Sequence, residues 1–152
     1  MTDAARRDPF LIIANPAAGR GRGRRTAEAV ADHLRQAGAG VSVRYTTSSG
    51  EAEDIARASA SGTDRPACIV VCGGDGTVQE VANALAYARE SLGESTPLMG
   101  LAPAGRCNDF ARALGIAADP AASQPLRPRA LSALAMHTLI SNPAYEASAA
   151  IR

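Results

Sequence analysis

A glycine-rich segment in the middle of the chain carries the residues best suited to bind a phosphate. The segment, Gly73–Thr77, reads Gly-Gly-Asp-Gly-Thr and follows an apolar run that ends at Cys72. Glycine has no Cβ, so its backbone can adopt positive φ and a phosphate can approach its N–H groups closely. Where such a turn opens a helix, the first N–H groups and the positive end of the helix dipole stabilise an anion. The segment therefore predicts a phosphate-binding turn.

The acidic residue inside this segment requires its own explanation. Asp75 would repel a phosphate, so it either orients the turn or holds Mg²⁺, directly or through a water molecule. Thr77 can bond a phosphate oxygen or cap the following helix, because Thr77-Val-Gln-Glu80 has the pattern of a capping box. The alternative for the whole segment is a plain turn between a strand and a helix, since short glycine motifs are weak signals by themselves.

Three further segments combine turn residues with polar or basic side chains. They are Asn15–Gly19 with the arginines that follow it, Tyr45–Gly50 with its hydroxyls, and Pro103–Arg112. Each also has an ordinary structural reading: a solvated loop, a helix cap, and a helix N-cap at Asn108 or Asp109. None of the three therefore identifies a binding site when it is taken alone.

The side chains of the last segment divide between these readings. We expect Phe110 to pack in the core rather than to stack on a ligand. Arg106 and Arg112 can each either reach a phosphate or remain solvated at the surface. The residue types alone do not choose between the two roles.

Alternating strand and helix patterns position all these segments. The predicted strands are 10–14, 41–45, 67–72 and 98–101, and the predicted helices are 24–37, 48–60, one that opens at 77, and 108–114. This order predicts βαβ units, a parallel sheet and right-handed crossovers. Ligands bind such sheets at the carboxyl ends of the strands, which is where the four segments fall.

The composition excludes several classes of function. With 152 residues, 46% hydrophobic, 20% charged and a mean hydropathy of −0.07, the chain suits one globular domain. A net charge of +1 and 3% aromatic residues give no reason to expect nucleic-acid binding. The chain contains no lysine, which excludes a Walker A lysine or a Schiff base. No apolar stretch reaches the roughly 18–20 residues that a membrane span needs.

The cysteines and the end of the chain add little chemistry. Cys68 and Cys72 fall on one face of a predicted strand and are expected to be plain buried thiols, while Cys107 lies in a loop. This pattern suits a reducing cytoplasm. After residue 118 the strand–helix rhythm stops, and only a short amphipathic pattern at 129–140 remains.

Taken together, the four segments resemble the N-terminal catalytic domain of the diacylglycerol kinase family, which includes bacterial diacylglycerol and related lipid kinases. The motifs that carry the resemblance occur in order: Asn15-Pro16-x-x-Gly19, Thr46-Thr47-x-x-Gly50, Gly73-Gly74-Asp75-Gly76-Thr77, and Pro103-x-Gly105-x-x-Asn108-Asp109-Phe110-Ala111-Arg112. The glycine segment alone is shared with NAD kinases and phosphofructokinases. The resemblance covers about residues 9–118 and leaves 119–152 as an atypical tail, expected to be a truncated or disordered end.

The resemblance implies an α/β fold with a parallel sheet flanked by helices, and a kinase that transfers the γ-phosphate of ATP to a lipid hydroxyl, with Mg²⁺. A diacylglycerol-like substrate would give phosphatidic acid. Asp75 is the candidate metal ligand. The residues implied in nucleotide binding are Asn15, Thr46, Gly73, Gly74, Asp75, Gly76, Thr77, Glu80, Gly105 and Arg106. The implied partners are ATP and a lipid alcohol at the inner membrane surface of the cytoplasm; homodimer formation is left open.

The chain departs from the family pattern in two places. The loop reads Gly105-Arg106-Cys107 where the family usually has Gly-Thr-Gly or Gly-Thr-Ala, so a long cation replaces a hydroxyl. Family members are also about twice as long, with a second, β-rich domain that closes the cleft and supplies the catalytic base. We therefore expect an incomplete chain whose catalytic base is unknown. The alternatives are a nucleotide-binding module without catalysis and an NAD kinase, although the Asn-Glu ribose motif of NAD kinases is not seen.

Overall fold

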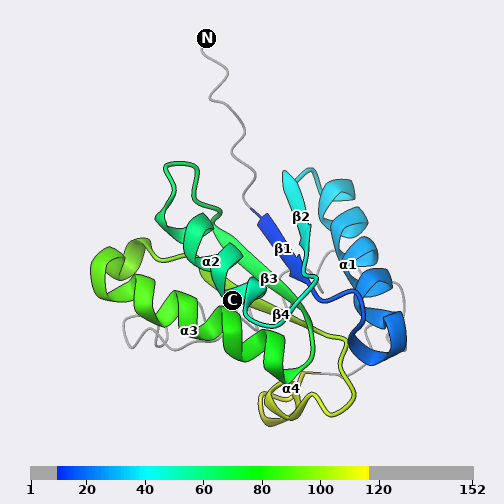
Figure 1. The fold of residues 1–152 in the computed structure, drawn as a ribbon. Helices are drawn as coiled ribbons and strands as arrows, with labels where there is room; N and C mark the ends of the chain where they lie inside the picture. Colours follow the sequence, from blue (N-terminus) through cyan, green and yellow to red (C-terminus); the bar gives the residue numbers. More distant parts are fainter. Residues whose placement is uncertain (1–9, 117–152) are drawn as a thin grey trace.

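The computed structural model describes residues 10–116 of the chain, in which strands and helices alternate (Figure 1). The elements are, in order, β1 (Phe10–Ala14), α1 (Ala18–Gln36), β2 (Val41–Tyr45), α2 (Glu51–Ser61), β3 (Cys68–Gly73), α3 (Asp75–Leu92), the 3₁₀ turn η1 (Gly93–Ser95), β4 (Leu98–Pro103) and α4 (Asp109–Ala113). The amphipathic pattern at 129–140 and the predicted tail lie outside the described residues.

The strands form one parallel sheet in the order β2-β1-β3-β4. The predicted α/β fold with a parallel sheet flanked by helices is thereby confirmed. The chain first runs from β1 outward to β2, and then returns to the other side of β1 for β3 and β4. The strand order therefore reverses between β1 and β3, and ligands bind such sheets at this switch point.

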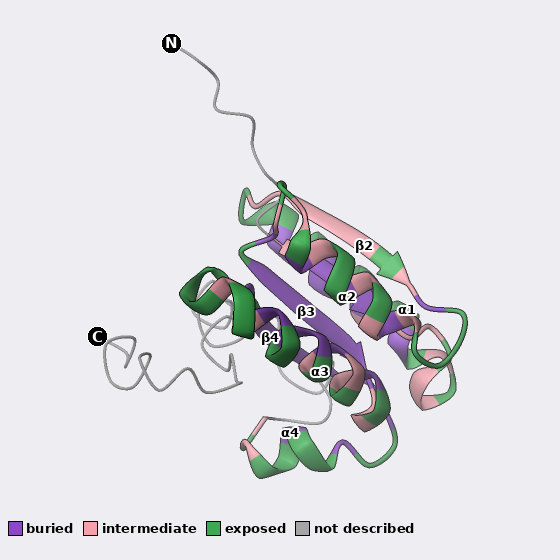
Figure 2. Cartoon of the chain, turned by 60° about the vertical axis from the view of Figure 1, so that its left-hand side comes forward, coloured by how far each residue is buried: buried purple, intermediate pink, exposed green. Residues whose placement is uncertain are grey.

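Helices cover both faces of the sheet, as Figure 2 shows. Helix α1 packs on one face against Ile12, Val70 and their neighbours, and α2 and α3 pack on the other against Leu11 and Ile69. Successive side chains of a strand point to opposite faces, which is why neighbours in β1 belong to different clusters. Because both faces are covered, β3 is buried along its whole length.

Short apolar runs located the strands well. β1 and β2 have the predicted bounds, while β3 and β4 extend beyond the predicted runs to Gly73 and Pro103. Cys68 and Cys72 are buried on the α1 face, as expected. Burial raises the pKa of the Cys68 thiol to about 11 and that of the Cys72 thiol to about 12, because the thiolate loses hydration.

The helix starts differ from the sequence predictions. Helix α1 begins at Ala18 instead of residue 24, but it contains a left-handed turn over 19–21, with φ values of 57°, 61° and 88°. Helix α2 begins at Glu51 instead of Ser48, because Gly50 has a φ of 86° and breaks the helical path. The Glu51 carboxylate accepts hydrogen bonds from the Thr47 N–H at 2.6 Å and the Ser48 N–H at 3.3 Å, in the loop that precedes the helix.

The described helices are all too short or too polar to cross a membrane. This holds for residues 10–116.

Candidate functional site

A cavity of about 720 Å³ opens at the carboxyl ends of the strands. All four segments singled out in the sequence contribute to its wall. The lining residues are Asn15–Gly19, Thr46–Ser49, Gly74, Gly76, Thr77, Glu80, Gly105 and Arg106. Loops that are distant in sequence meet here because the parallel strands all end at the same edge of the sheet.

The residues predicted to bind nucleotide lie at this edge, but two of them do not line the cavity. Gly73 is buried at the end of β3, and Asp75 is directed toward α4. The other predicted residues face the cavity: Asn15, Thr46, Gly74, Gly76, Thr77, Glu80, Gly105 and Arg106. Their contacts with a nucleotide remain a prediction.

Glycines of the Gly73–Thr77 and Pro103–Arg112 segments allow the two backbones to pack against each other. A Cβ on Gly105 would lie 2.5 Å from the Gly74 Cα, and a Cβ on Gly73 would lie 2.7 Å from the Thr77 Oγ1. None of these residues has positive φ. Glycine is required here for close approach and not for a left-handed conformation, which corrects half of the sequence argument.

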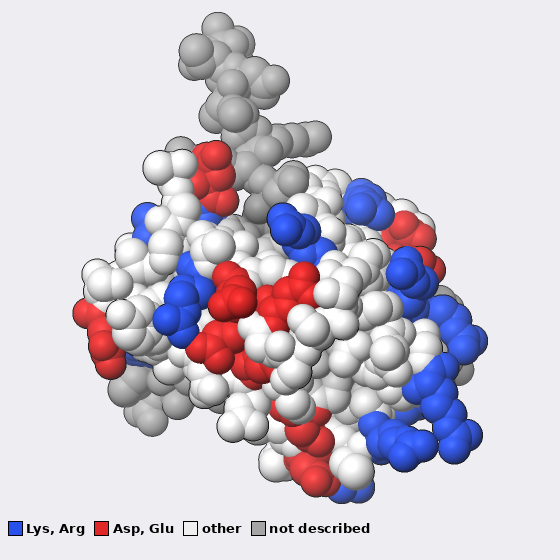
Figure 3. Space-filling view, in the orientation of Figure 1, with Lys and Arg blue, Asp and Glu red and all other residues white. Residues whose placement is uncertain are grey.

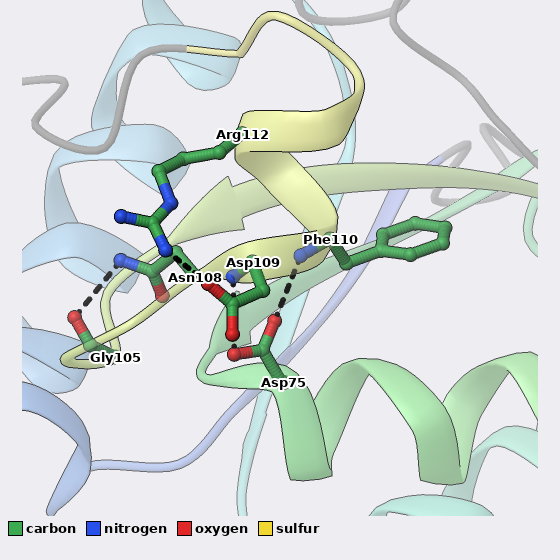
Figure 4. Close-up of polar contacts among 6 residues, drawn as sticks. All are labelled: Asp75, Gly105, Asn108, Asp109, Phe110 and Arg112. Carbon is green, nitrogen blue, oxygen red and sulfur yellow. Dashed lines mark hydrogen bonds and ion pairs between the residues drawn. The ribbon is translucent and has the colours of Figure 1, made fainter.

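The Asp75 carboxylate caps helix α4 across the site. Its Oδ2 accepts a hydrogen bond from the Asp109 N–H at 3.2 Å, and its Oδ1 accepts one from the Phe110 N–H at 3.1 Å (Figure 4). Asp75 therefore has a structural role at α4, outside its own turn, and its role as a metal ligand stays a prediction. Asn108 occupies the N-cap position of α4, as expected, but its side chain makes no cap hydrogen bond and instead donates to the Gly105 carbonyl at 2.9 Å.

The Glu80 carboxylate caps helix α2 rather than its own helix. It accepts hydrogen bonds from the Gly50 N–H at 2.9 Å and the Ala52 N–H at 3.2 Å, and from the Ser49 hydroxyl at 3.3 Å. The predicted capping box at Thr77 is wrong, because α3 begins two residues earlier, at Asp75. Glu80 thus connects the end of the Tyr45–Gly50 segment to α3 by hydrogen bonds.

Phe110 and Arg112 both face away from the core. Phe110 is 38% exposed, so its expected core position is wrong. The apolar contacts of this segment with the core come from Leu114 and Ile116. Arg112 forms a surface ion pair with Asp109 on the same short helix, as Figure 4 shows, which leaves Arg106 as the arginine of this segment at the cavity.

One structural residue of the site was missed by the sequence reasoning. The Arg22 Nη2 donates a hydrogen bond of 2.7 Å to the Gly105 carbonyl. This bond links the chain after Asn15–Gly19 to the Pro103–Arg112 segment. The sequence indicates only a solvated loop, or a basic loop suited to phosphate contact, at Asn15–Gly19 and the arginines that follow it. A contact between residues 83 positions apart leaves no local signal, although it shows that the first loop is anchored at this end of the sheet.

Charged side chains are spread unevenly over the face drawn in Figure 3. In Figure 3, arginine side chains gather along the side where α1 lies, and acidic side chains gather over α2 and α3. Within the described lining of the cavity, Arg106 is the only basic residue and Glu80 the only acidic one. The described residues contain no group of three or more His, Cys, Asp or Glu that could hold a metal ion.

A switch point lined by glycine turns and by the start of a helix is typical of α/β domains that bind phosphorylated ligands. The comparisons agree with this class and narrow it. The chain belongs to the diacylglycerol kinase catalytic domain family, whose model matches residues 9–140.

Individual relatives have names that agree with this family. A protein of Bacillus subtilis (strain 168) named "Diacylglycerol kinase" is 39% identical over 105 residues, which is 69% of this chain and 32% of the relative. A protein of Stenotrophomonas maltophilia (strain K279a) named "Probable lipid kinase YegS-like" is 44% identical over 89 residues, 58% of this chain and 28% of the relative.

A solved structure agrees with the fold. The crystal structure of a diacylglycerol kinase from Bacillus anthracis str. Sterne superposes with a TM-score of 0.61 at 33% identity, and covers 74% of this chain and 36% of that one. The chain spans about a third of the length of the relatives it matches.

Proposed function

We propose that this domain binds ATP in the cavity and takes part in transfer of the γ-phosphate to a lipid hydroxyl. A diacylglycerol-like alcohol as substrate would give phosphatidic acid. The observation that carries the proposal is the convergence of all four family motifs on one cavity. Its volume of about 720 Å³ falls within the range of roughly 300–1,000 Å³ for small-molecule sites.

The described residues are suited to hold the phosphates in place. Gly76 leaves open space, and Gly74 lines the cavity with it, beside the first turn of α3, where N–H groups lack partners within the helix. The Thr77 hydroxyl can add a donor, and Asn15 and Thr46, whose side chains bond the Ala17 N–H and the Ala14 carbonyl, also line the cavity. Phosphoryl transfer depends mainly on such positioning and on charge stabilisation, so the absence of lysine is no obstacle.

Magnesium would neutralise charge on the phosphates, and Asp75 is the candidate for holding it, although its carboxylate is directed toward α4 and does not line the cavity. Mg²⁺ is commonly bound through one or two carboxylates together with substrate phosphates and water, so a single carboxylate fits that mode of binding. Each Asp75 oxygen accepts one backbone hydrogen bond and retains a free lone pair. Asp75 would thus serve the metal and helix α4 at once.

The base that accepts the substrate proton is expected outside residues 10–116. Glu80, the only acidic side chain in the described lining, is engaged by the amides of Gly50 and Ala52. We expect the reaction to take place in the cytoplasm at the inner membrane surface, with ATP and a lipid alcohol as partners. Association into homodimers stays a prediction.

Calorimetry with ATP and Mg²⁺ tests the first half of the proposal. We expect saturable binding to the chain and weaker binding to Asp75→Ala, and no detectable binding would contradict the proposal. Transfer of labelled γ-phosphate to diacylglycerol in mixed lipid vesicles tests the second half. Binding without transfer to any lipid would indicate a nucleotide-binding module, and formation of NADP would indicate an NAD kinase.

A further inference from the structure

Arg106 places an uncompensated positive charge at the cavity. It is exposed, and it is the only cationic side chain among the described lining residues. Within residues 10–116, its guanidinium has no hydrogen bond, ion pair or ring contact, whereas Arg22, Arg57 and Arg112 all have partners. A cation without a protein partner at the wall of a cavity is free to meet an anionic ligand.

The backbone that carries Arg106 is held firmly. The carbonyl of the preceding residue, Gly105, accepts hydrogen bonds from Arg22 at 2.7 Å and from Asn108 at 2.9 Å. The Gly105 N–H donates to the Gly73 carbonyl at 3.2 Å, and Gly105 packs closely on Gly74. The long side chain of Arg106 therefore starts from a fixed point beside the first turn of α3.

The other charge of the cavity wall does not neutralise Arg106. The Glu80 carboxylate is used by the Gly50 and Ala52 amides and by the Ser49 hydroxyl, and it forms no ion pair with Arg106. The remaining lining consists of glycine, alanine, proline and neutral polar residues. The cavity lining thus offers a phosphate several neutral donors and the positive charge of Arg106, and the Arg22 guanidinium, which bonds the neutral Gly105 carbonyl, adds a second positive charge beside it.

We infer that Arg106 binds the phosphate chain of the nucleotide and makes affinity increase with the number of phosphates. This inference rests on the proposed function and names the part of the ligand that Arg106 recognises. A guanidinium presents paired N–H donors that match two oxygens of one phosphate, and it stays charged at every pH of interest. The same fork gives no comparable gain with an uncharged nucleoside.

Binding of four probes by the wild-type chain and three variants tests the inference. The probes are ATP, AMP, adenosine and inorganic triphosphate, each measured by calorimetry at low and high salt. Arg106→Gln removes the charge and Arg106→Lys keeps it without the planar fork. Arg65→Gln is the matched control, because it removes the same charge at a different place. Arg65 precedes the amino end of β3, whereas the cavity lies at the carboxyl ends of the strands, and Arg65 does not line it.

We expect Arg106→Gln to weaken ATP and triphosphate binding about tenfold or more, in the range for a hydrogen bond to a charged group, and to reduce the dependence on salt. The affinity for adenosine should stay unchanged. The affinity of Arg106→Lys for ATP and triphosphate should lie between those of the wild type and Arg106→Gln, and the affinity of Arg65→Gln should equal that of the wild type. Full ATP affinity in Arg106→Gln, or an equal loss for adenosine, would overturn the inference alone. Failure of the wild-type chain to bind ATP and triphosphate would overturn the proposed function with it.

Discussion

The carboxylate of Asp75 accepts a hydrogen bond from the backbone N–H of Phe110, 35 positions further along the chain. Five residues after Asp75, Glu80 does the same for the N–H of Gly50, 30 positions earlier. Helix α3 therefore caps both α2 and α4 with its own side chains. Because these two caps border the cavity, the loops around it are held through one helix.

Replacement of Asp75 should loosen helix α4. Asp75→Ala leaves the N–H groups of Asp109 and Phe110 without their acceptor, and loss of a helix cap costs about 1 kcal/mol of unfolding free energy. Urea unfolding measures the loss, and hydrogen exchange should accelerate at these two amides. Asp64→Ala, at an exposed position with no hydrogen bond within residues 10–116, should change neither quantity. Unchanged exchange at Phe110 in Asp75→Ala would contradict the capping role.

Replacement of Glu80 should affect α2, which lies on a different part of the chain. Glu80→Ala removes the acceptor of the Gly50 and Ala52 amides and should lower the unfolding free energy by about 1 kcal/mol. Hydrogen exchange should become faster at residues 50–52 although the substitution is in α3. Glu90→Ala, an exposed substitution on the same helix, serves as the control. Equal exchange in the two variants would show that the cap does not stabilise α2.

Two glycines of the site should respond in opposite ways to the same added methyl group. Gly105→Ala places a Cβ 2.5 Å from the Gly74 Cα and 2.8 Å from the Asn108 Oδ1, so the loops must separate, and we expect a loss of about 1–3 kcal/mol. Gly76→Ala meets nothing within 4 Å and lies in α3, where alanine is favoured by roughly 0.5–1 kcal/mol. Thermal unfolding of both variants measures the difference. A stable Gly105→Ala would show that the loops do not require this close approach.

The thiols should differ sharply in reactivity. Burial raises the pKa of Cys68 to about 11 and of Cys72 to about 12, so at pH 8 both stay protonated and inaccessible, while Cys107 is exposed. Ellman's reagent should label only Cys107 in the native protein and all three thiols in guanidinium. Because the two folded pKa values exceed the ordinary value of 9.0, the stability contribution of these thiols is complete below pH 9 and decreases above it. Rapid native labelling that persists in Cys107→Ser would contradict the buried placement.

Local patterns in the sequence are sufficient to predict the parallel sheet and to identify the family. The runs Phe10–Ala14 and Val41–Tyr45 predicted strands with the observed bounds, because a short apolar or alternating run reports its own burial. The order of strands and helices predicted the parallel sheet, and hence that the loops after Ala14, Tyr45 and β3 would meet at one edge. These properties depend on residues close together in the chain.

The partners of individual side chains were decided only by the tertiary structure. The pattern Thr77-Val-Gln-Glu80 fits a cap on its own helix as well as the observed cap on α2. Phe110 is of a residue type that is usually buried, yet it is exposed. Likewise, nothing near Arg22 indicates that Gly105 is its acceptor. A carboxylate or guanidinium bonds whichever complementary group the crossovers of the chain bring within reach, and that distance is set by packing across the whole sheet rather than by neighbouring residues.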